Sequence, residues 1–361
     1  MIGILTIFAG AITAGVKTKL KSTRRYASLI HTTMSNSQIP IIDFGKIKND
    51  LGRAEVAQEI SSACRENGFF YVAGHGVSLE LQKRIAKLSH EFFALPEEDK
   101  LQIAMTKGGR AWRGYFAVND ELTSGKPDKK EGIYFGTELS ANDARVKAQL
   151  PLHGSNLFPQ SPIGFKETVL EYIDVVTEVG HTVMQGVSLS LNLPADYFYQ
   201  KYNRDPLILF RIFHYPPQPI NTNSWGVGEH TDYGLLTILL QDSVGGLQVK
   251  SRGEWIAAPP IENTFICNIG DMLDKMTGGV YRSTPHRVLN VSGKSRLSFP
   301  LFFDPGFDTV IERIENIPQT STGDEAPRWD NANPHQFGGT YGEYLLNKVG
   351  KVFPGLKDQV L

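Results

Sequence analysis

Residues Leu207–Tyr215 read LILFRIFHY and open a region in which short β-rich segments alternate with Gly, Pro and Asp turns. Similar segments follow at 235–241, 247–250, 264–269, 287–290 and 297–303. Evenly spaced short strands that are separated by turn residues are typical of a β-sandwich or a barrel. We therefore predict a jelly-roll-like β core that begins near residue 207.

The chain before this core is predicted to be mainly helical. Apolar residues recur near helical spacing over 55–66, 79–95 and 164–193, and strand-like runs occur at 39–44 and 69–72. Residues 104–160 show little periodicity, so we interpret them as a long loop region with short strands at 114–116 and 132–136. The predicted fold class is α+β with a mainly β core and flanking helices, including a long helix before the core.

The first 37 residues differ in composition from the rest. An apolar stretch at 1–15 is followed by five basic residues, and the first acidic residue is Asp43. An acid-free basic leader is typical of a mitochondrial presequence, whereas a start at Met34 would omit it. We expect a cytoplasmic protein and keep mitochondrial targeting by residues 1–33 as the alternative.

These patterns divide the chain into four parts. Residues 1–37 are a targeting leader or a disordered extension, and 38–160 form an N-terminal region. Residues 161–345 hold the β core with its preceding helix, and 346–361 form a C-terminal tail.

The composition indicates a globular protein that acts on a small molecule. Hydrophobic residues make up 41% of the 361 residues, charged residues make up 21%, and the formal net charge is -1. A nearly neutral chain has no global field that attracts nucleic acid or an anionic membrane, so we expect neither partner and no stable membrane insertion. We interpret Cys64 and Cys267 as reduced intracellular thiols, and we expect a monomer.

The sharpest local motif is GEHTDYG at residues 228–234. On an extended segment, His230 and Asp232 point to the same side because side chains alternate along a strand. His286 follows 54 residues after Asp232 and opens another strand-like run. Two imidazoles and one carboxylate form a facial triad that suits Fe(II), since three coordination positions stay open. A zinc hydrolase site is the alternative.

Arg296 and Ser298 follow on the next β-rich run, ten and twelve residues after His286. A guanidinium binds a carboxylate through two parallel hydrogen bonds, and a serine two residues later faces the same way along a strand. The order and spacing predict a site for a carboxylate cosubstrate next to the metal.

At this point the sequence resembles the 2-oxoglutarate/Fe(II)-dependent dioxygenases of the isopenicillin N synthase-like superfamily, the iron/ascorbate-dependent oxidoreductase family. The resemblance covers about residues 38–345. It rests on IPIIDF at 39–44, GFFYV at 68–72, GHG at 74–76, FFALP at 92–96, HTD at 230–232, GGLQ at 245–248, GDML at 270–273, HRV at 286–288 and RLS at 296–298.

The resemblance implies a double-stranded β-helix with flanking helices. It implies that His230, Asp232 and His286 bind Fe(II), and that Arg296 and Ser298 hold 2-oxoglutarate with help from Tyr215. The family often has Asn two residues before that tyrosine, where this chain has Phe213. The implied activity is hydroxylation or a related oxidation of a small organic substrate, with O2 as the second cosubstrate and ascorbate as a reductant.

Other interpretations of the same motifs stay open at this stage. Isopenicillin N synthase and aminocyclopropanecarboxylate oxidase also carry Arg-x-Ser, which there binds a substrate carboxylate, so an iron oxidase without 2-oxoglutarate is an alternative. Residues 114–116, 121–128 and 231–236 are similar to bacterial ethylene-forming enzyme. A non-catalytic jelly-roll binding protein is a third interpretation, which the intact motif disfavours.

Candidate substrate contacts follow from position alone. Arg211 faces the same way as Phe213 and Tyr215 by strand alternation, so Arg211 and Phe213 are candidate substrate contacts, and Arg211 could bind an acidic substrate group. Tyr115 in the long loop region and Phe303 after the clamp are candidates for an aromatic pocket wall, with ordinary core packing as the alternative. Glu131 and His214 are further polar candidates.

Overall fold

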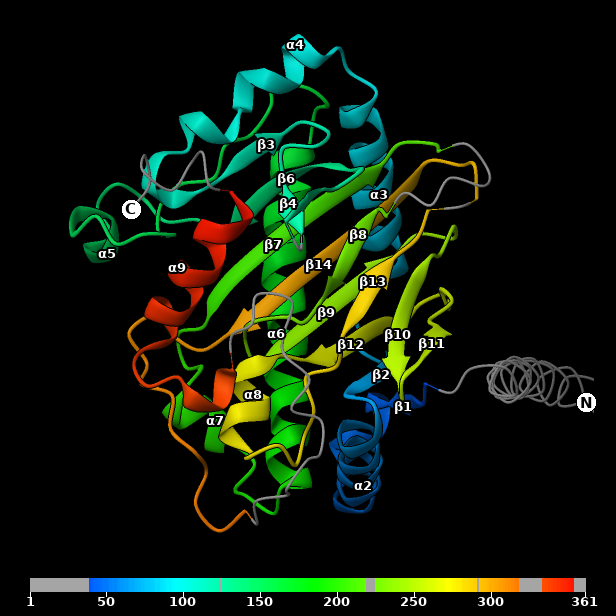
Figure 1. Ribbon diagram of the computed structural model, residues 1–361, viewed down its shortest axis with the longest axis vertical. Helices are drawn as coiled ribbons and strands as arrows, with labels where there is room; N and C mark the ends of the chain where they lie inside the picture. Colours follow the sequence, from blue (N-terminus) through cyan, green and yellow to red (C-terminus); the bar gives the residue numbers. More distant parts are fainter. Residues whose placement is uncertain (1–38, 124, 219–224, 291, 318–332, 354–361) are drawn as a thin grey trace, which may run out of the picture.

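The computed structural model describes residues 39–123, 125–218, 225–290, 292–317 and 333–353. The predicted leader at 1–37 lies outside these residues. Two sheets form the centre of the molecule, and they lie face to face in the jelly-roll arrangement (Figure 1).

The larger sheet has eight strands. Their order is β1 (Ile41–Asp43), β2 (Phe69–Ala73), β12 (Phe265–Ile269), β9 (Leu236–Gln241), β14 (Arg296–Asp304), β7 (Leu207–Tyr215), β6 (Glu131–Gly136) and β3 (Gly114–Phe116). The β1–β2 pair is parallel and the other pairs are antiparallel, so the sheet is mixed.

The smaller sheet has four strands. Their order is β11 (Glu254–Ala257), β10 (Leu247–Ser251), β13 (His286–Val288) and β8 (Val227–His230). A separate hairpin is formed by β4 (Leu122–Thr123) and β5 (Lys126–Pro127).

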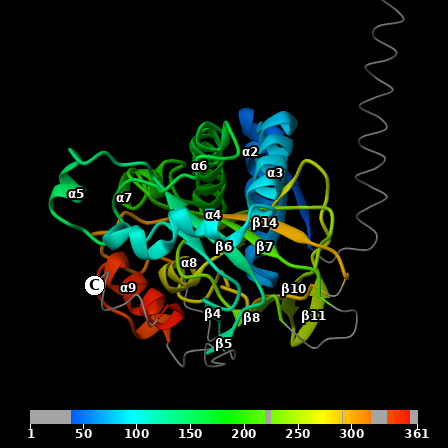
Figure 2. The same ribbon diagram turned by 90° about the horizontal axis from the view of Figure 1, so that it is seen from above.

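Helices cover the face of the larger sheet that the smaller sheet leaves open. The long helices α2 (Asp50–Glu66), α3 (Leu79–Phe93) and α6 (Phe165–Ser190) lie on this side (Figure 2). The side chain of Asn49 caps α2 and that of Ser78 caps α3, as short polar residues do at helix starts. The shorter helices are α4 (Glu97–Lys100), α5 (Ala144–Lys147), α7 (Tyr197–Lys201), α8 (Asp271–Met276) and α9 (Tyr341–Val352). The 3-10 helices are η1 (Phe44–Lys48), η2 (Leu101–Ile103), η3 (Met105–Lys107), η4 (Gly109–Ala111) and η5 (Pro334–Gln336).

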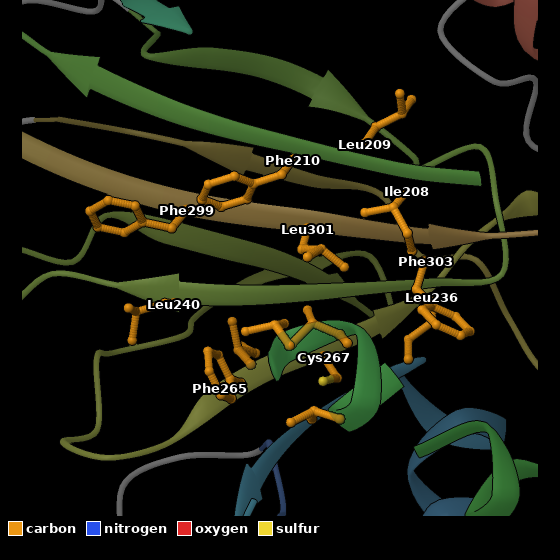
Figure 3. Packing of buried hydrophobic residues seen from close by; sticks show 14 of the residues in the cluster. Ile208, Leu209, Phe210, Leu236, Leu240, Phe265, Cys267, Phe299, Leu301 and Phe303 are labelled. Carbon is orange, nitrogen blue, oxygen red and sulfur yellow. The ribbon is translucent and has the colours of Figure 1, made fainter. Parts of the chain in front are cut away.

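Alternation along β7 and β14 separates the hydrophobic core from the interior between the sheets. Phe210, Phe299, Leu301 and Phe303 are buried and belong to one packed cluster (Figure 3). Phe303 packs against α6 so closely that a Cβ on Gly180 would lie 2.3 Å from its ring. The intervening residues of both strands therefore face the other way, toward the smaller sheet.

Each predicted β-rich run from Leu207–Tyr215 onward overlaps a strand, and each predicted helix exists. The missed elements include β8, β11, α8 and α9, and α9 crosses the predicted boundary at residue 345. Cys64 and Cys267 are buried free thiols, as predicted. None of the helices among the described residues combines the length and the apolar character needed to cross a bilayer.

Candidate metal centre

Three ligand side chains converge between the sheets. His230 is the last residue of β8 and His286 is the first of β13, and the two residues are paired across these strands. Asp232 Oδ1 lies 3.8 Å from His230 Nε2 and 3.7 Å from His286 Nε2. One ligand atom from each residue lies within 4.8 Å of the others, which is the spacing of a metal site.

The predicted geometry of the His-x-Asp pair was wrong in one respect. Asp232 lies in the loop after β8 and not on the strand, so strand alternation does not direct its carboxylate. Hydrogen bonds direct it instead. Thr237 Oγ1 on β9 and Asn268 Nδ2 on β12 donate to Asp232 Oδ2 over 2.5 and 2.7 Å. The other oxygen, Oδ1, is left to face the two imidazoles.

Both imidazoles are also held by their far nitrogen. His230 Nδ1 donates to the carbonyl oxygen of Gly228 over 2.9 Å, and His286 Nδ1 donates to that of Thr284 over 3.2 Å. A carbonyl oxygen only accepts, so Nδ1 carries the hydrogen and the lone pair of Nε2 faces the centre. Such outer bonds set the tautomer and orientation of metal-binding histidines.

The protonation states of the three residues match those of metal ligands. Burial lowers the pKa of His286 to about 4, with the nearby His230 acting in the same direction. Burial also lowers the pKa of His230. Burial alone would raise the pKa of Asp232, but the two histidines and the hydrogen bonds from Asn268 and Thr237 outweigh it, so its pKa is lowered. The site therefore presents two neutral imidazoles and a carboxylate at neutral pH.

The same pocket holds a buried guanidinium at its other end. Arg296 is 0% exposed, and its Nε donates to the carbonyl oxygen of Gly245. Its two terminal nitrogens are buried and have no hydrogen-bond partner in the part of the chain that the structure describes. Tyr215 lies under the guanidinium at 4.7 Å, and Ser298 lines the same pocket. Gly246 has a φ of 104°, and a Cβ there would lie 2.3 Å from the carbonyl oxygen of Leu289, so this turn requires glycine.

A second guanidinium lies farther along β7. Arg211 is stacked between the rings of Tyr134 and Phe302, at 4.0 and 4.8 Å. Its Nη1 lies 3.7 Å from Glu121 Oε1, and its Nε has no hydrogen-bond partner. Arg211 is four residues from Tyr215, a separation of about 13 Å along a strand. The pocket therefore has two cationic ends.

Comparison with known proteins identifies the family. The N-terminal model of the non-haem dioxygenase in morphine synthesis matches residues 39–161, and the 2OG-Fe(II) oxygenase superfamily model matches residues 206–305. A Dictyostelium discoideum protein named as an iron/ascorbate oxidoreductase is 53% identical over 90% of this chain and 97% of its own length. The chain belongs to the 2OG-Fe(II) oxygenase superfamily.

Other relatives span most of this oxygenase as well. The 1-aminocyclopropane-1-carboxylate oxidase of Dictyostelium mucoroides is 43% identical over 88% of this chain and 95% of its own. A homoarginine-6-hydroxylase of Oryza sativa subsp. japonica is 38% identical over 86% of this chain and 96% of its own length. The crystal structure of a Neurospora crassa protein in complex with alpha-KG and thymine has a TM-score of 0.72 and 28% identity, covering 86% of this chain and 96% of that one.

The oxygenase is an oxidoreductase that uses Fe(II) and 2-oxoglutarate, and its fold is the double-stranded β-helix of the superfamily. Its own residues fit both groups. The donor set of two imidazole nitrogens and one carboxylate oxygen suits Fe(II). The unpartnered fork of Arg296 matches a carboxylate, because a buried guanidinium without partners is costly until an anion binds it.

Two of the predicted substrate contacts lie outside this pocket. Tyr115 and Phe303 do not line the pocket, although Arg211 and Phe213 do. Phe303 follows the pocket-facing Phe302 by one residue, so strand alternation turns it toward α6. Tyr115 donates instead to Glu131 Oε2 over 2.6 Å on the helix side of the sheet.

Further pocket residues of the oxygenase were missed. Glu121 and Lys130 lie in or beside the block at 121–128 that resembles ethylene-forming enzyme, and they form an ion pair of 2.8 Å. Their residue types gave a signal, but a loop carries no periodicity that shows where a side chain points. Other missed residues include Tyr134, Tyr233, Phe302, Asp304, Leu345, Val349, Val352 and Phe353.

Proposed function

We propose that this oxygenase oxidises a free amino acid, with His230, Asp232 and His286 holding Fe(II) and Arg296 holding 2-oxoglutarate. The observation that carries the cosubstrate assignment is the pair of buried, unpartnered terminal nitrogens of Arg296 in the same pocket as the triad. When bound, the iron and 2-oxoglutarate supply the oxidation of the substrate by O2, in which 2-oxoglutarate is decarboxylated to succinate.

The protein's own residues position the reactants. Arg296 receives the far carboxylate of the cosubstrate through two parallel hydrogen bonds, and Ser298 and Tyr215 complete this end of the pocket. Thr237 and Asn268 fix the Asp232 carboxylate, so its free oxygen stays directed at the metal. Holding the partners in a reactive orientation is the protein's main contribution to such chemistry.

The substrate assignment rests on opposite charges at the Arg211 end. The carboxylate of Glu121 is buried, and burial raises its pKa. The positive charges of Lys130 and Arg211 outweigh this effect, so the pKa is lowered and the carboxylate is ionised. Arg211 Nε keeps a free donor for a carboxylate, and the ionised Glu121, which is paired with Lys130, adds negative charge to the same part of the pocket. An amino acid carries both a carboxylate and a positive charge, and the named substrates of two relatives, 1-aminocyclopropane-1-carboxylate and homoarginine, are amino acids.

A substrate panel tests this assignment. Succinate release from 2-oxoglutarate is measured with homoarginine, arginine and 1-aminocyclopropane-1-carboxylate, and with thymine as a neutral control. We expect at least one amino acid, and not thymine, to stimulate release. In Arg211→Gln the KM for that amino acid rises about tenfold, the loss of one charge-assisted hydrogen bond, while the cosubstrate KM changes less than about twofold. Stimulation by thymine alone would contradict the amino-acid proposal.

We also propose that the oxygenase acts as a monomer without nucleic acid, in the cytoplasm. The nearly neutral net charge of -1 supports the absence of a nucleic-acid partner. The acid-free leader supports mitochondrial import as the alternative. Fractionation of cells that express the full chain and a chain starting at Met34 distinguishes the compartments, and light scattering tests the monomer.

A further inference from the structure

A chain of three polar side chains crosses the larger sheet on the face opposite the pocket. Glu131 on β6 and His214 on β7 are cross-strand partners, and His214 Nδ1 lies 2.7 Å from Glu131 Oε1. His214 Nε2 lies 2.7 Å from Oγ of Ser295, the residue that precedes β14. A carboxylate only accepts, so Nδ1 donates to Glu131, and Nε2 forms the hydrogen bond with the Ser295 hydroxyl.

These three hydrogen-bonded side chains also contact residues of the helical layer. Glu131 also accepts hydrogen bonds from Tyr115 Oη over 2.6 Å and from Lys100 Nζ over 2.7 Å. The ring of Phe93 in α3 stacks on His214 at 5.0 Å. Because the Glu131 carboxylate accepts several hydrogen bonds, it fixes the position of the His214 ring. The His214 ring in turn fixes the position of the Ser295 hydroxyl.

His214 and Ser295 each stand one residue before a residue of the cosubstrate clamp. Tyr215 follows His214, Arg296 follows Ser295, and Tyr215 and Arg296 are themselves paired across β7 and β14. Arg296 is the first residue of β14, so the backbone that carries it lies at a strand end. Strand ends fray unless other contacts hold them, and the bond from Ser295 to His214 is such a contact.

We propose that Glu131, His214 and Ser295 are positioning residues for 2-oxoglutarate that act through Arg296 and Tyr215. This proposal rests on the proposed role of Arg296. Among the described residues, the guanidinium of Arg296 makes one hydrogen bond, through Nε, and its two terminal nitrogens make none. The orientation of the guanidinium therefore depends on the position of the backbone at residue 296. Bidentate binding tolerates an error of only about 0.5 Å, so a small shift of this strand end weakens cosubstrate binding.

The test is Ser295→Ala, which removes one hydroxyl outside the pocket. Cosubstrate binding is measured directly by equilibrium dialysis with protein loaded with redox-inert Mn(II), and steady-state kinetics are measured with iron. We expect the dissociation constant and the KM for the cosubstrate to rise about three- to tenfold, the loss of one hydrogen bond's positioning effect, while kcat stays within about twofold. Ser295→Thr keeps the hydroxyl and restores the binding constant.

Ser190→Ala is the matched control, since Ser190 Oγ in α6 makes an equally short hydroxyl bond of 2.7 Å to Tyr281 Oη. A Ser295→Ala protein that binds 2-oxoglutarate as tightly as the parent overturns the proposal. So does a Ser190→Ala protein that is weakened as much, because the effect would then be general destabilisation. Arg296→Lys is measured in the same assay. If this variant also binds 2-oxoglutarate as tightly as the parent, the proposed role of Arg296 is contradicted, and the positioning role that rests on it falls as well. If it binds weakly while Ser295→Ala is unaffected, only the positioning role fails.

Discussion

At the scale of single residues, the site depends on which atoms are already occupied. Asp232 Oδ2 is held by two donors and both histidine Nδ1 atoms donate to carbonyl oxygens, so the remaining atoms face one point. At Arg296 the same logic is reversed, because buried donors are left without partners. At the triad the free acceptor atoms mark a metal site, and at Arg296 the free donor atoms mark a site for a carboxylate.

The outer hydrogen bonds of Asp232 carry a direct prediction. Thr237→Val keeps the volume of the side chain but removes the donor to Oδ2, so the carboxylate loses one of its two orienting bonds. We expect metal affinity to fall by about 10- to 100-fold, as for other outer partners of metal ligands. Anaerobic equilibrium dialysis with Mn(II) measures it. Thr264→Val removes a hydroxyl bond to the backbone of Ile261 outside the site and should leave metal affinity unchanged.

The Arg296 fork carries the second prediction. Arg296→Lys keeps the positive charge but loses the planar pair of donors, so the cosubstrate KM should rise about tenfold or more. The KM for the amino-acid substrate, bound at the Arg211 end, should change much less. An equal rise in both constants in steady-state assays would indicate a general loss of structure and not the loss of a clamp.

At the scale of strands and helices, periodicity explains which features the sequence could predict. The apolar run of β7 and the amphipathic pattern of α6 show where buried faces lie. The bounds of β7 were predicted correctly, and those of α6 to within three residues. β8 is short and reads VGEH, with little apolar character, so the strand that carries His230 had no such signal. The place of α9 against the pocket depends on tertiary contacts that no local pattern encodes.

Phe302 and Phe303 are adjacent on β14 and face opposite sides of the sheet, so substituting each of them tests this assignment of the two faces. Phe303 is fully buried against α6, so Phe303→Ala should lower the free energy of unfolding by about 3–5 kcal/mol and leave the KM for the amino acid unchanged in the surviving folded protein. Phe302 stacks on Arg211, so Phe302→Ala should raise that KM with a smaller loss of stability. Denaturant unfolding and kinetics on both variants check the pair, and the reverse pattern would show that the faces are exchanged.

Asp304 links the end of β14 to α9 and gives a pH-dependent prediction. It accepts a hydrogen bond from Tyr341, and burial raises its pKa to about 7. The unfolded value is about 3.9, so in the metal-free protein its stabilising contribution is full below pH about 4 and is lost as the pH rises through about 7. Relative to the parent, Asp304→Asn should therefore gain roughly 2–4 °C in Tm between pH 5 and pH 8. A Tm difference that stays constant with pH would contradict this.

At the scale of the whole molecule, the metal centre joins the two sheets. His230 and His286 belong to the smaller sheet, whereas Asp232 is held by Thr237 and Asn268 of the larger one. A bound ion would therefore connect the two layers. The same centre lies in a pocket that α9 helps to line, so the C-terminal helix, the two sheets and the cofactor site form one structural unit.

This arrangement predicts that metal binding stabilises the fold. At a free Mn(II) concentration of about 100 times its dissociation constant, the folded state should gain about 2.7 kcal/mol, which raises Tm by several degrees. His230→Ala should abolish the increase, whereas a chelator should remove it from the parent protein. Thermal unfolding at several metal concentrations measures this, and a Tm that does not depend on metal would indicate that the triad binds none.

The most direct test of the proposed reaction follows 2-oxoglutarate in protein loaded anaerobically with Fe(II). On admission of O2 with an amino-acid substrate, we predict release of succinate that requires iron, oxygen and 2-oxoglutarate together and is lost in Asp232→Ala. Turnover that persists without oxygen, or an oxygen-dependent reaction that leaves 2-oxoglutarate unconsumed, would contradict this reaction.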